Sequence, residues 1–109
     1  MAYDEKLAAR IRKLIAGDER MTERKMFGGI AFMLNGNMHC GVIKDDLMVR
    51  VGPHGHDDAL AKSFARPMDF ANRPMKGMIY VSPEGVVGRG LKTWVDRSLK
   101  FAALLPPKR

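Results

Sequence analysis

The chain has little cysteine, few aromatic side chains and no long hydrophobic run. A single cysteine, Cys40, among 109 residues excludes an internal disulfide and is typical of a reducing compartment. No window approaches the roughly 18 consecutive apolar residues that a membrane helix needs, and the charged N-terminal segment lacks the apolar core of a signal peptide. We therefore expect a cytoplasmic protein with no membrane partner.

Common catalytic motifs are also missing from the sequence, which contains no GxSxG, HExxH or CxxC pattern. The acidic pairs Asp45-Asp46 and Asp57-Asp58 are explained by a turn and by a helix start. His39 and Cys40 are neighbours in a predicted strand, so we expect them to point to opposite faces and His39 not to activate Cys40. We predict a protein that is not an enzyme and has no catalytic residues and no cofactor.

Three histidines keep one alternative open, which is a small-molecule or metal-binding domain of unknown role. His54 and His56, in an extended loop, are of a type that binds metal, but a zinc site needs a third or fourth ligand. The remaining histidine, His39, lies elsewhere in the chain. We expect no metal site.

The chain is strongly basic, with 19 Lys and Arg against 12 Asp and Glu and a net charge of +7. Such a balance favours polyanions or acidic protein surfaces. A glycine-rich loop before the last predicted helix could also hold an anion, beside Arg89. Direct non-specific nucleic-acid binding is therefore a second alternative. The candidate contacts with nucleic acid or another anion are Arg24, Lys25, Arg66, Arg73, Lys76 and Arg89.

The strongest structural signal is Asn35-Gly36, which favours a type I′ hairpin turn because both residues tolerate positive φ. Asp45-Asp46 predicts a second two-residue turn. Residues 24–52 therefore form three predicted antiparallel strands, in which Phe32 opposes His39, Met33 opposes Met38, Val42 opposes Val49 and Ile43 opposes Met48.

Apolar spacing predicts helices over residues 3–16, 56–65 and 91–104, and strands near 66–70 and 75–81. Residues 21–27 are predicted to be a connector. The order is α-β(3)-α-β(2)-α, an α+β class with two layers, in which an antiparallel sheet packs against helices. We expect one domain over residues 1–109.

Strand alternation predicts one uniformly apolar face that packs on the helices, formed by Ala31, Met33, Met38, Cys40, Val42, Leu47, Val49 and Val51. The opposite face is also rather apolar, and it collects Ile30, Phe32, Leu34, His39, Ile43, Met48 and Arg50. We expect another element or a partner to cover that second face, and a homodimer is one form of such cover. The nine methionines are predicted to be mainly core filler.

The strings ERKMFGGIAFMLNGNMHCGVIKDDLMVRVGP, ARPMDF, RPMKGMIYVSPEG and LLPPK strongly resemble the N-terminal domain of the TfoX/Sxy family. This resemblance implies the same α-β(3)-α-β(2)-α fold and a role as co-regulator of transcription in bacterial competence. Full-length regulators of this type carry a further C-terminal domain, so we expect a stand-alone N-terminal domain. We predict a regulator that acts through a protein partner, such as a transcription regulator.

Overall fold

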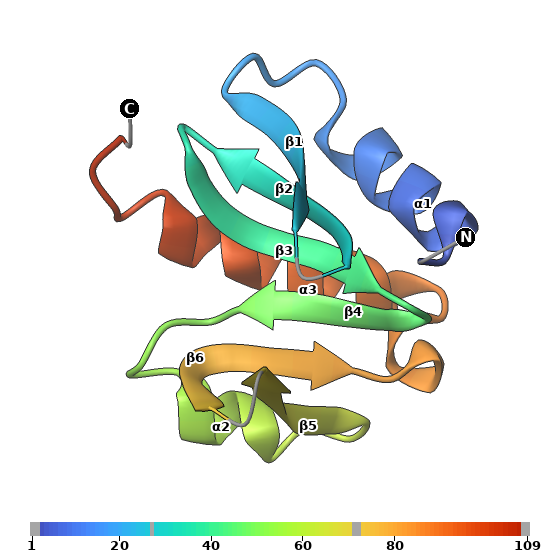
Figure 1. The fold of residues 1–109 in the computed structure, drawn as a ribbon, viewed down its shortest axis with the longest axis vertical. Coiled ribbons are helices and arrows are strands. Elements are labelled where there is room, and N and C mark those ends of the chain that lie inside the picture. Colours follow the sequence, from blue (N-terminus) through green and yellow to red (C-terminus); the bar gives the residue numbers. More distant parts are fainter. Residues whose placement is uncertain (1–2, 27, 71–72, 108–109) are drawn as a thin grey trace.

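The computed structural model describes residues 3–26, 28–70 and 73–107, without the side chains of 69, 70 and 73–75. The elements, in chain order, are α1 (Glu5–Ile15), β1 (Met21–Met26), β2 (Gly29–Leu34), β3 (Asn37–Ile43), β4 (Asp46–Arg50), α2 (His56–Leu60), β5 (Ala65–Phe70), β6 (Arg73–Val81), the short 3-10 helix η1 (Pro83–Val86) and α3 (Arg89–Ala102) (Figure 1).

The strands form one antiparallel six-stranded sheet in the order β1-β2-β3-β4-β6-β5. Helix α3 runs behind β3 and β4 in Figure 1, and α1 lies beside it. Buried side chains of all three helices join one core with one face of the sheet. The predicted α+β class, with helices packed on an antiparallel sheet, is confirmed.

Helix α1 shows why the terminal segments pack on the sheet. Asp4 is its N-cap, and the Asp4 Oδ1 atom accepts hydrogen bonds from the backbone N–H groups of Lys6 (2.9 Å) and Leu7 (3.1 Å). Leu7 and Ile11 fall on one side of the helix and are buried. The apolar side of α1 therefore faces the core, as its sequence spacing predicts.

Strand β1 is an addition to the predicted order, because residues 21–27 were expected to be a connector. Four strands, rather than three, precede α2. The segment Thr22–Lys25 is exposed and carries no apolar alternation, so nothing in its pattern marks a strand. It pairs as an edge strand with β2. Phe27 lies outside the described residues.

The first predicted turn is confirmed, with Asn35 at φ 51° and Gly36 at φ 83°. The predicted turn at Asp45-Asp46 is wrong, because Ile43 pairs with Asp46 and the turn residues are Lys44 and Asp45. The Lys44 carbonyl accepts a hydrogen bond from the Asp4 N–H (2.7 Å), so the start of α1 holds this turn.

The shifted turn changes the partners along the second hairpin. Val42 opposes Leu47 and not Val49, so the predicted pairing of Ile43 with Met48 is also wrong. The shift is two residues long. It therefore leaves each side chain on its predicted face, because strand side chains alternate with a period of two.

A β-bulge explains the remaining errors in the first hairpin. Phe32 pairs with Cys40 and Met33 with Met38, so His39 is an extra residue in β3 and the predicted pair of Phe32 with His39 is wrong. The extra residue exchanges the two faces of β2. Ile30 and Phe32 lie in the helix-side core, whereas Ala31 and Met33 lie on the opposite face.

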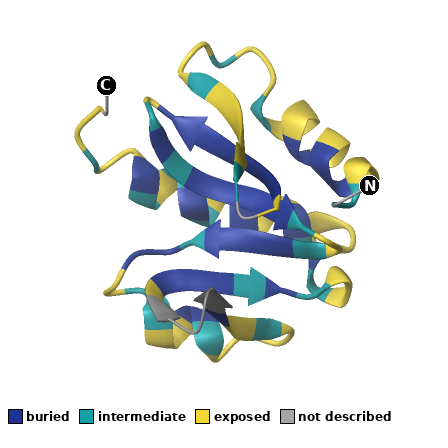
Figure 2. Ribbon diagram, viewed as in Figure 1, coloured by how far each residue is buried: buried dark blue, intermediate teal, exposed yellow. Residues whose placement is uncertain are grey.

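The opposite face of the sheet is lined by methionine, and we call it the methionine face. Its buried members are Ala31, Met33, Met48, Met68 and Met78, and its partly buried members are Met26, Met38, Ile43 and Tyr80. Six of the nine methionines therefore gather there. The central strands are buried along most of their length (Figure 2). Most of these methionines fill the interior, as expected.

Candidate functional site

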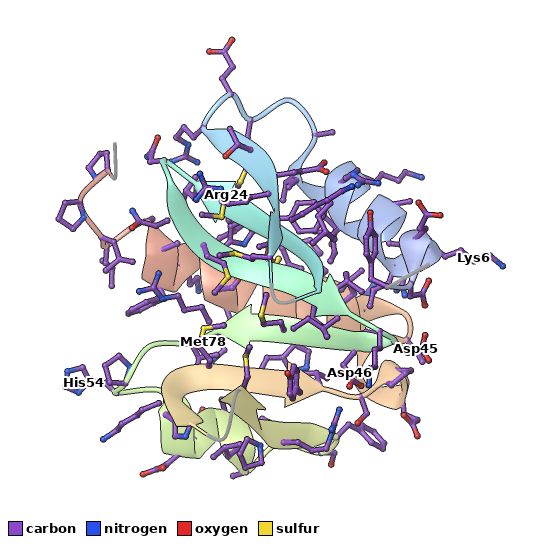
Figure 3. All side chains as sticks on the ribbon, in the orientation of Figure 1. Lys6, Arg24, Asp45, Asp46, His54 and Met78 are labelled. Carbon is purple, nitrogen blue, oxygen red and sulfur yellow. The ribbon has the colours of Figure 1, made fainter. Side chains whose placement is uncertain are left out.

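A cavity of about 470 Å³ opens on the methionine face, and we call it the methionine pocket. It is lined by Thr22, Glu23, Arg24, Met26, Met33, Gly36, Asn37, Met38 and Arg50. This volume is within the range of about 300–1,000 Å³ that is typical of ligand pockets. Figure 3 shows Arg24 on the part of the sheet that β1 and β2 form.

Strand β1 forms one wall of the methionine pocket. Arg24 is paired with Ala31 and Thr22 with Met33, and directly opposed residues of an antiparallel pair share a face. Glu23 must then point to the helix side. Its carboxylate accepts two hydrogen bonds from Arg12 of α1, at 2.7 and 2.9 Å. Among the described residues that line the pocket, the one acidic side chain is therefore already paired on the other face.

Arg50, at the end of β4, supplies the second positive charge of the pocket. Its Nη1 atom donates to the Met38 carbonyl at 3.3 Å, and its guanidinium carbon lies 5.4 Å from the centroid of the Phe101 ring. Within the described part of the chain, neither Arg24 nor Arg50 has a carboxylate partner. Two uncompensated cations beside thioether groups suit an anion with a neighbouring apolar group.

Sequence reasoning identified Arg24 but not Arg50. Arg50 was placed correctly on the second face, and it was the only Lys or Arg predicted there. A single arginine in a predicted apolar face was therefore the sequence signal that could have indicated Arg50 as a site residue. The signal is weak, because a charged residue at a strand end usually reaches solvent.

The other predicted contact residues do not assemble around Arg24. Lys25 follows Arg24 in the same strand and therefore points to the opposite face. Arg66 is engaged elsewhere, with Asp46 at 2.7 Å and with the Tyr80 ring at 5.4 Å. Arg66 is paired with Tyr80, so it shares the methionine face with Arg24 but lies on the opposite edge strand of the sheet, whereas Lys25 points to the other face.

Arg73, Lys76 and Arg89 complete the predicted set. Lys76 is an exposed residue of β6, and Arg89 begins α3 in the helical layer. The Arg73 side chain lies outside the described part. The five cations whose side chains are described therefore do not form one cluster, and the contacts of the predicted set with nucleic acid or another anion stay a prediction.

His39, Cys40 and Ser98 form a buried polar cluster on the helix side. The Ser98 hydroxyl donates to the Val95 carbonyl at 2.7 Å, so the His39 Nδ1–H donates to Ser98 Oγ at 3.1 Å. The His39 Nε2 atom has no hydrogen-bond partner within the described part of the chain. Both His39 and Cys40 lie on this side because of the bulge, so the predicted opposite orientation is wrong.

Burial keeps the His39 ring and the Cys40 thiol in their neutral forms. It lowers the pKa of His39 from 6.5 to about 4 and raises the pKa of the Cys40 thiol to about 12. A neutral thiol is a poor nucleophile, and both residues are fully buried. The hydrogen bond between His39 and Ser98 joins β3 to α3, so this cluster supports a role in packing the helix on the sheet.

The histidines of the β4–α2 loop stand apart from this cluster. His56 Nδ1 accepts a hydrogen bond from the Gly77 N–H at 2.9 Å, and Figure 3 shows His54 at the margin of the molecule. Among the described residues, no three His, Cys, Asp or Glu side chains are grouped so that they could hold a metal ion. In the same part of the chain, no helix has the length and apolar character needed to cross a membrane.

Comparison with known proteins gives one result. The model of the TfoX N-terminal domain family matches residues 13–102, which is most of the chain. No curated protein and no solved structure matches it significantly.

Proposed function

The chain belongs to the TfoX N-terminal domain family, and from this premise we propose that it is a cytoplasmic co-regulator of transcription, linked to bacterial competence, that acts by binding another protein. The observation that carries the proposal is the methionine pocket. It combines adaptable thioether side chains with two arginines that have no acidic partner in the described part of the chain.

The composition of the pocket supports a protein partner. Methionine adapts its shape to irregular surfaces, and arginine is enriched at the energetically dominant positions of protein interfaces. Met26 and Met38 are only partly buried, so they can contact a partner while Met33 and Met48 stay in the interior. A partner carboxylate would give Arg24 the counter-ion that it lacks.

Direct nucleic-acid binding is the second candidate, and the net charge of +7 favours it. This reading predicts that log K falls by about 0.9 per contacted phosphate for each tenfold rise in salt. A mobility-shift titration at two salt concentrations measures that slope. The opposite orientation of Arg24 and Lys25 argues against one continuous phosphate-binding surface on β1.

Site-specific photo-crosslinking in native host cells tests the proposal. A photoreactive phenylalanine analogue replaces Met38, which lines the pocket, and in a matched control it replaces Lys6, an exposed residue of α1. We expect a discrete protein adduct from position 38 only. This adduct should survive nuclease treatment and disappear when Arg24→Glu is added.

Two results would count against a protein partner. Adducts from position 38 that vanish with nuclease would favour the nucleic-acid candidate. No adduct from position 38, with the variant folded and expressed, would remove the methionine pocket as a contact surface for proteins.

A further inference from the structure

Among the described residues, strand β1 pairs only with β2 and is the first strand of the sheet, so its outer edge has no neighbouring strand there. The Asn35 N–H donates to the Arg20 carbonyl at 2.9 Å. Backbone hydrogen bonds of an antiparallel pair recur at every second residue, so the backbone groups of Thr22 and Arg24 also face β2. Those of Glu23 and Lys25 point away from the sheet.

This free edge and the methionine pocket are parts of the same strand. Thr22, Arg24 and Met26 line the pocket, whereas Glu23 and Lys25 carry the outward backbone groups. A chain that paired with Glu23 and Lys25 would extend the sheet next to the pocket wall. Its side chains would alternate between the two faces, so every second one would lie on the methionine face.

The charge of the pocket selects the chemistry of such a chain. Arg24 and Arg50 have no carboxylate partner in the described part of the chain, and the Glu23 carboxylate is held by Arg12. An incoming strand with an acidic residue on this face would neutralise Arg24, the cation on the neighbouring strand, and the positive field of Arg50 would add to the attraction. An apolar residue at another position on the same face would contact Met26, which lies on β1 itself.

A second copy of the chain fits the same edge less well. Antiparallel pairing of two β1 strands about Arg24 would set the two Arg24 side chains directly opposite each other. Like charges in directly opposed positions are destabilising. The Arg50 side chain of each copy would add a further positive charge on the same face.

We propose that the free edge of β1 and the methionine pocket together bind an acidic, extended segment of a partner protein. The segment adds to the sheet as a further strand through the backbones of Glu23 and Lys25. It places a carboxylate at Arg24 and an apolar side chain beside Met26, both of which belong to β1. This inference rests on the proposed function, because it names the chemistry of the partner that the regulator binds.

Peptide binding to the full chain tests the strand. The probe is a fluorescein-labelled peptide of about six residues, the usual length of a strand. Its first, third and fifth residues are Glu, Val and Glu, with Thr between them, so that Glu and Val lie on the same face of the added strand. A peptide with Lys in place of Glu is the charge control. We expect the acidic peptide to bind and the basic one not to bind. Arg24→Gln should weaken binding about tenfold, whereas Lys6→Gln should leave it unchanged.

A pair of variants at one position separates backbone pairing from charge. Lys25→Pro removes the outward N–H group without touching a hydrogen bond to β2, and proline is tolerated at sheet edges. Lys25→Gln removes only the charge. We expect at least about tenfold weaker peptide binding with proline and no change with glutamine. Circular dichroism reports whether the proline variant is folded.

Amide hydrogen exchange on the unaltered chain gives a second measurement that needs no variant. Bound acidic peptide should slow exchange at Glu23 and Lys25, whose N–H groups face the free edge. Unchanged exchange at both positions, with saturating peptide, would overturn the added strand.

Other outcomes name other occupants and also overturn the proposal. Equal effects of Lys25→Pro and Lys25→Gln, together with binding of octanoate at the pocket, would indicate a site for small amphipathic anions. A dimer in sedimentation that Lys25→Pro abolishes would indicate a second copy. If the crosslink at position 38 persists in Lys25→Pro, the protein partner stands and only the added strand fails.

Discussion

Replacing His39 by asparagine should reduce the loss of stability that the protein suffers in acid. The His39 side chain is fully buried between β3 and α3, and its Nε2 atom has no hydrogen-bond partner in the described part of the chain. Burial lowers its pKa from 6.5 to about 4, because a charged imidazolium would lose its hydration there. The folded protein therefore requires the neutral ring.

The sign and size of the effect follow from this pKa. The unfolded chain binds a proton near pH 6.5, but the folded protein binds it only near pH 4. The contribution of His39 is thus complete above pH 6.5 and is lost as the pH falls towards 4. Linkage gives a loss of about 2 kcal/mol near pH 5 and about 3 kcal/mol in total.

Urea unfolding of both proteins at pH 7 and pH 5 measures the effect. The free energy of unfolding should fall between these pH values by about 2 kcal/mol more in the unaltered protein than in His39→Asn. Titration of Asp18 does not interfere, because its hydrogen bonds with Arg20 lower its pKa to about 2. Parallel pH dependence in the two proteins would refute the reasoning. Should the variant fail to fold, an NMR titration midpoint of His39 near 6.5 would refute it equally.

Two further predictions concern the strands around His39. Gly41→Ala should lower the free energy of unfolding by about 1–3 kcal/mol, because a Cβ atom there collides with the Ile30 carbonyl oxygen. Urea denaturation at neutral pH measures this, and an unchanged midpoint would contradict it. Cys40 should not react with a thiol reagent at pH 8 in the folded protein and should react fully in denaturant, because burial raises its pKa to about 12; equal rates in both conditions would argue against the buried position.

The sequence was sufficient for the class of fold and for the turn of the first hairpin, because these depend on local signals. Asn35 and Gly36 need positive φ, and few other residues adopt it at low cost. The second turn was displaced by one residue because a distant group, the Asp4 N–H, binds the Lys44 carbonyl. The residues around Asp45 do not indicate that contact, because Asp4 is far away in the sequence.

The two faces of β2 could not be predicted without the bulge at His39. A single extra residue reverses the alternation, so Phe32 faces the helices and Met33 faces the pocket. The bulge is accompanied by the hydrogen bond between His39 and Ser98, whose positions are far apart in the chain. A prediction based on strict alternation of side chains cannot take such a long-range contact into account and therefore misses the bulge.

The candidate site was visible only in part, through Arg24. The pocket needs the exchanged face of β2, the unpredicted strand β1 and the end of β4 at Arg50. Each is set by pairing between strands, and β1 lacks the apolar alternation that marks a strand in a sequence. The residue types alone therefore indicated a positively charged site, but not that Arg24 lies beside the methionines of the pocket.

The last described residues of the chain are tied to the rim of the methionine pocket. The Asn37 side-chain amide donates to the Pro106 carbonyl at 2.8 Å, and Figure 1 shows the segment that follows α3 beside the β2–β3 turn and the start of α1 at a distance from it. A candidate segment fused there through a short flexible linker would meet the pocket at an effective concentration in the millimolar range. Weak binders would thus become measurable in a single polypeptide, whereas purification tags are better attached to the opposite end.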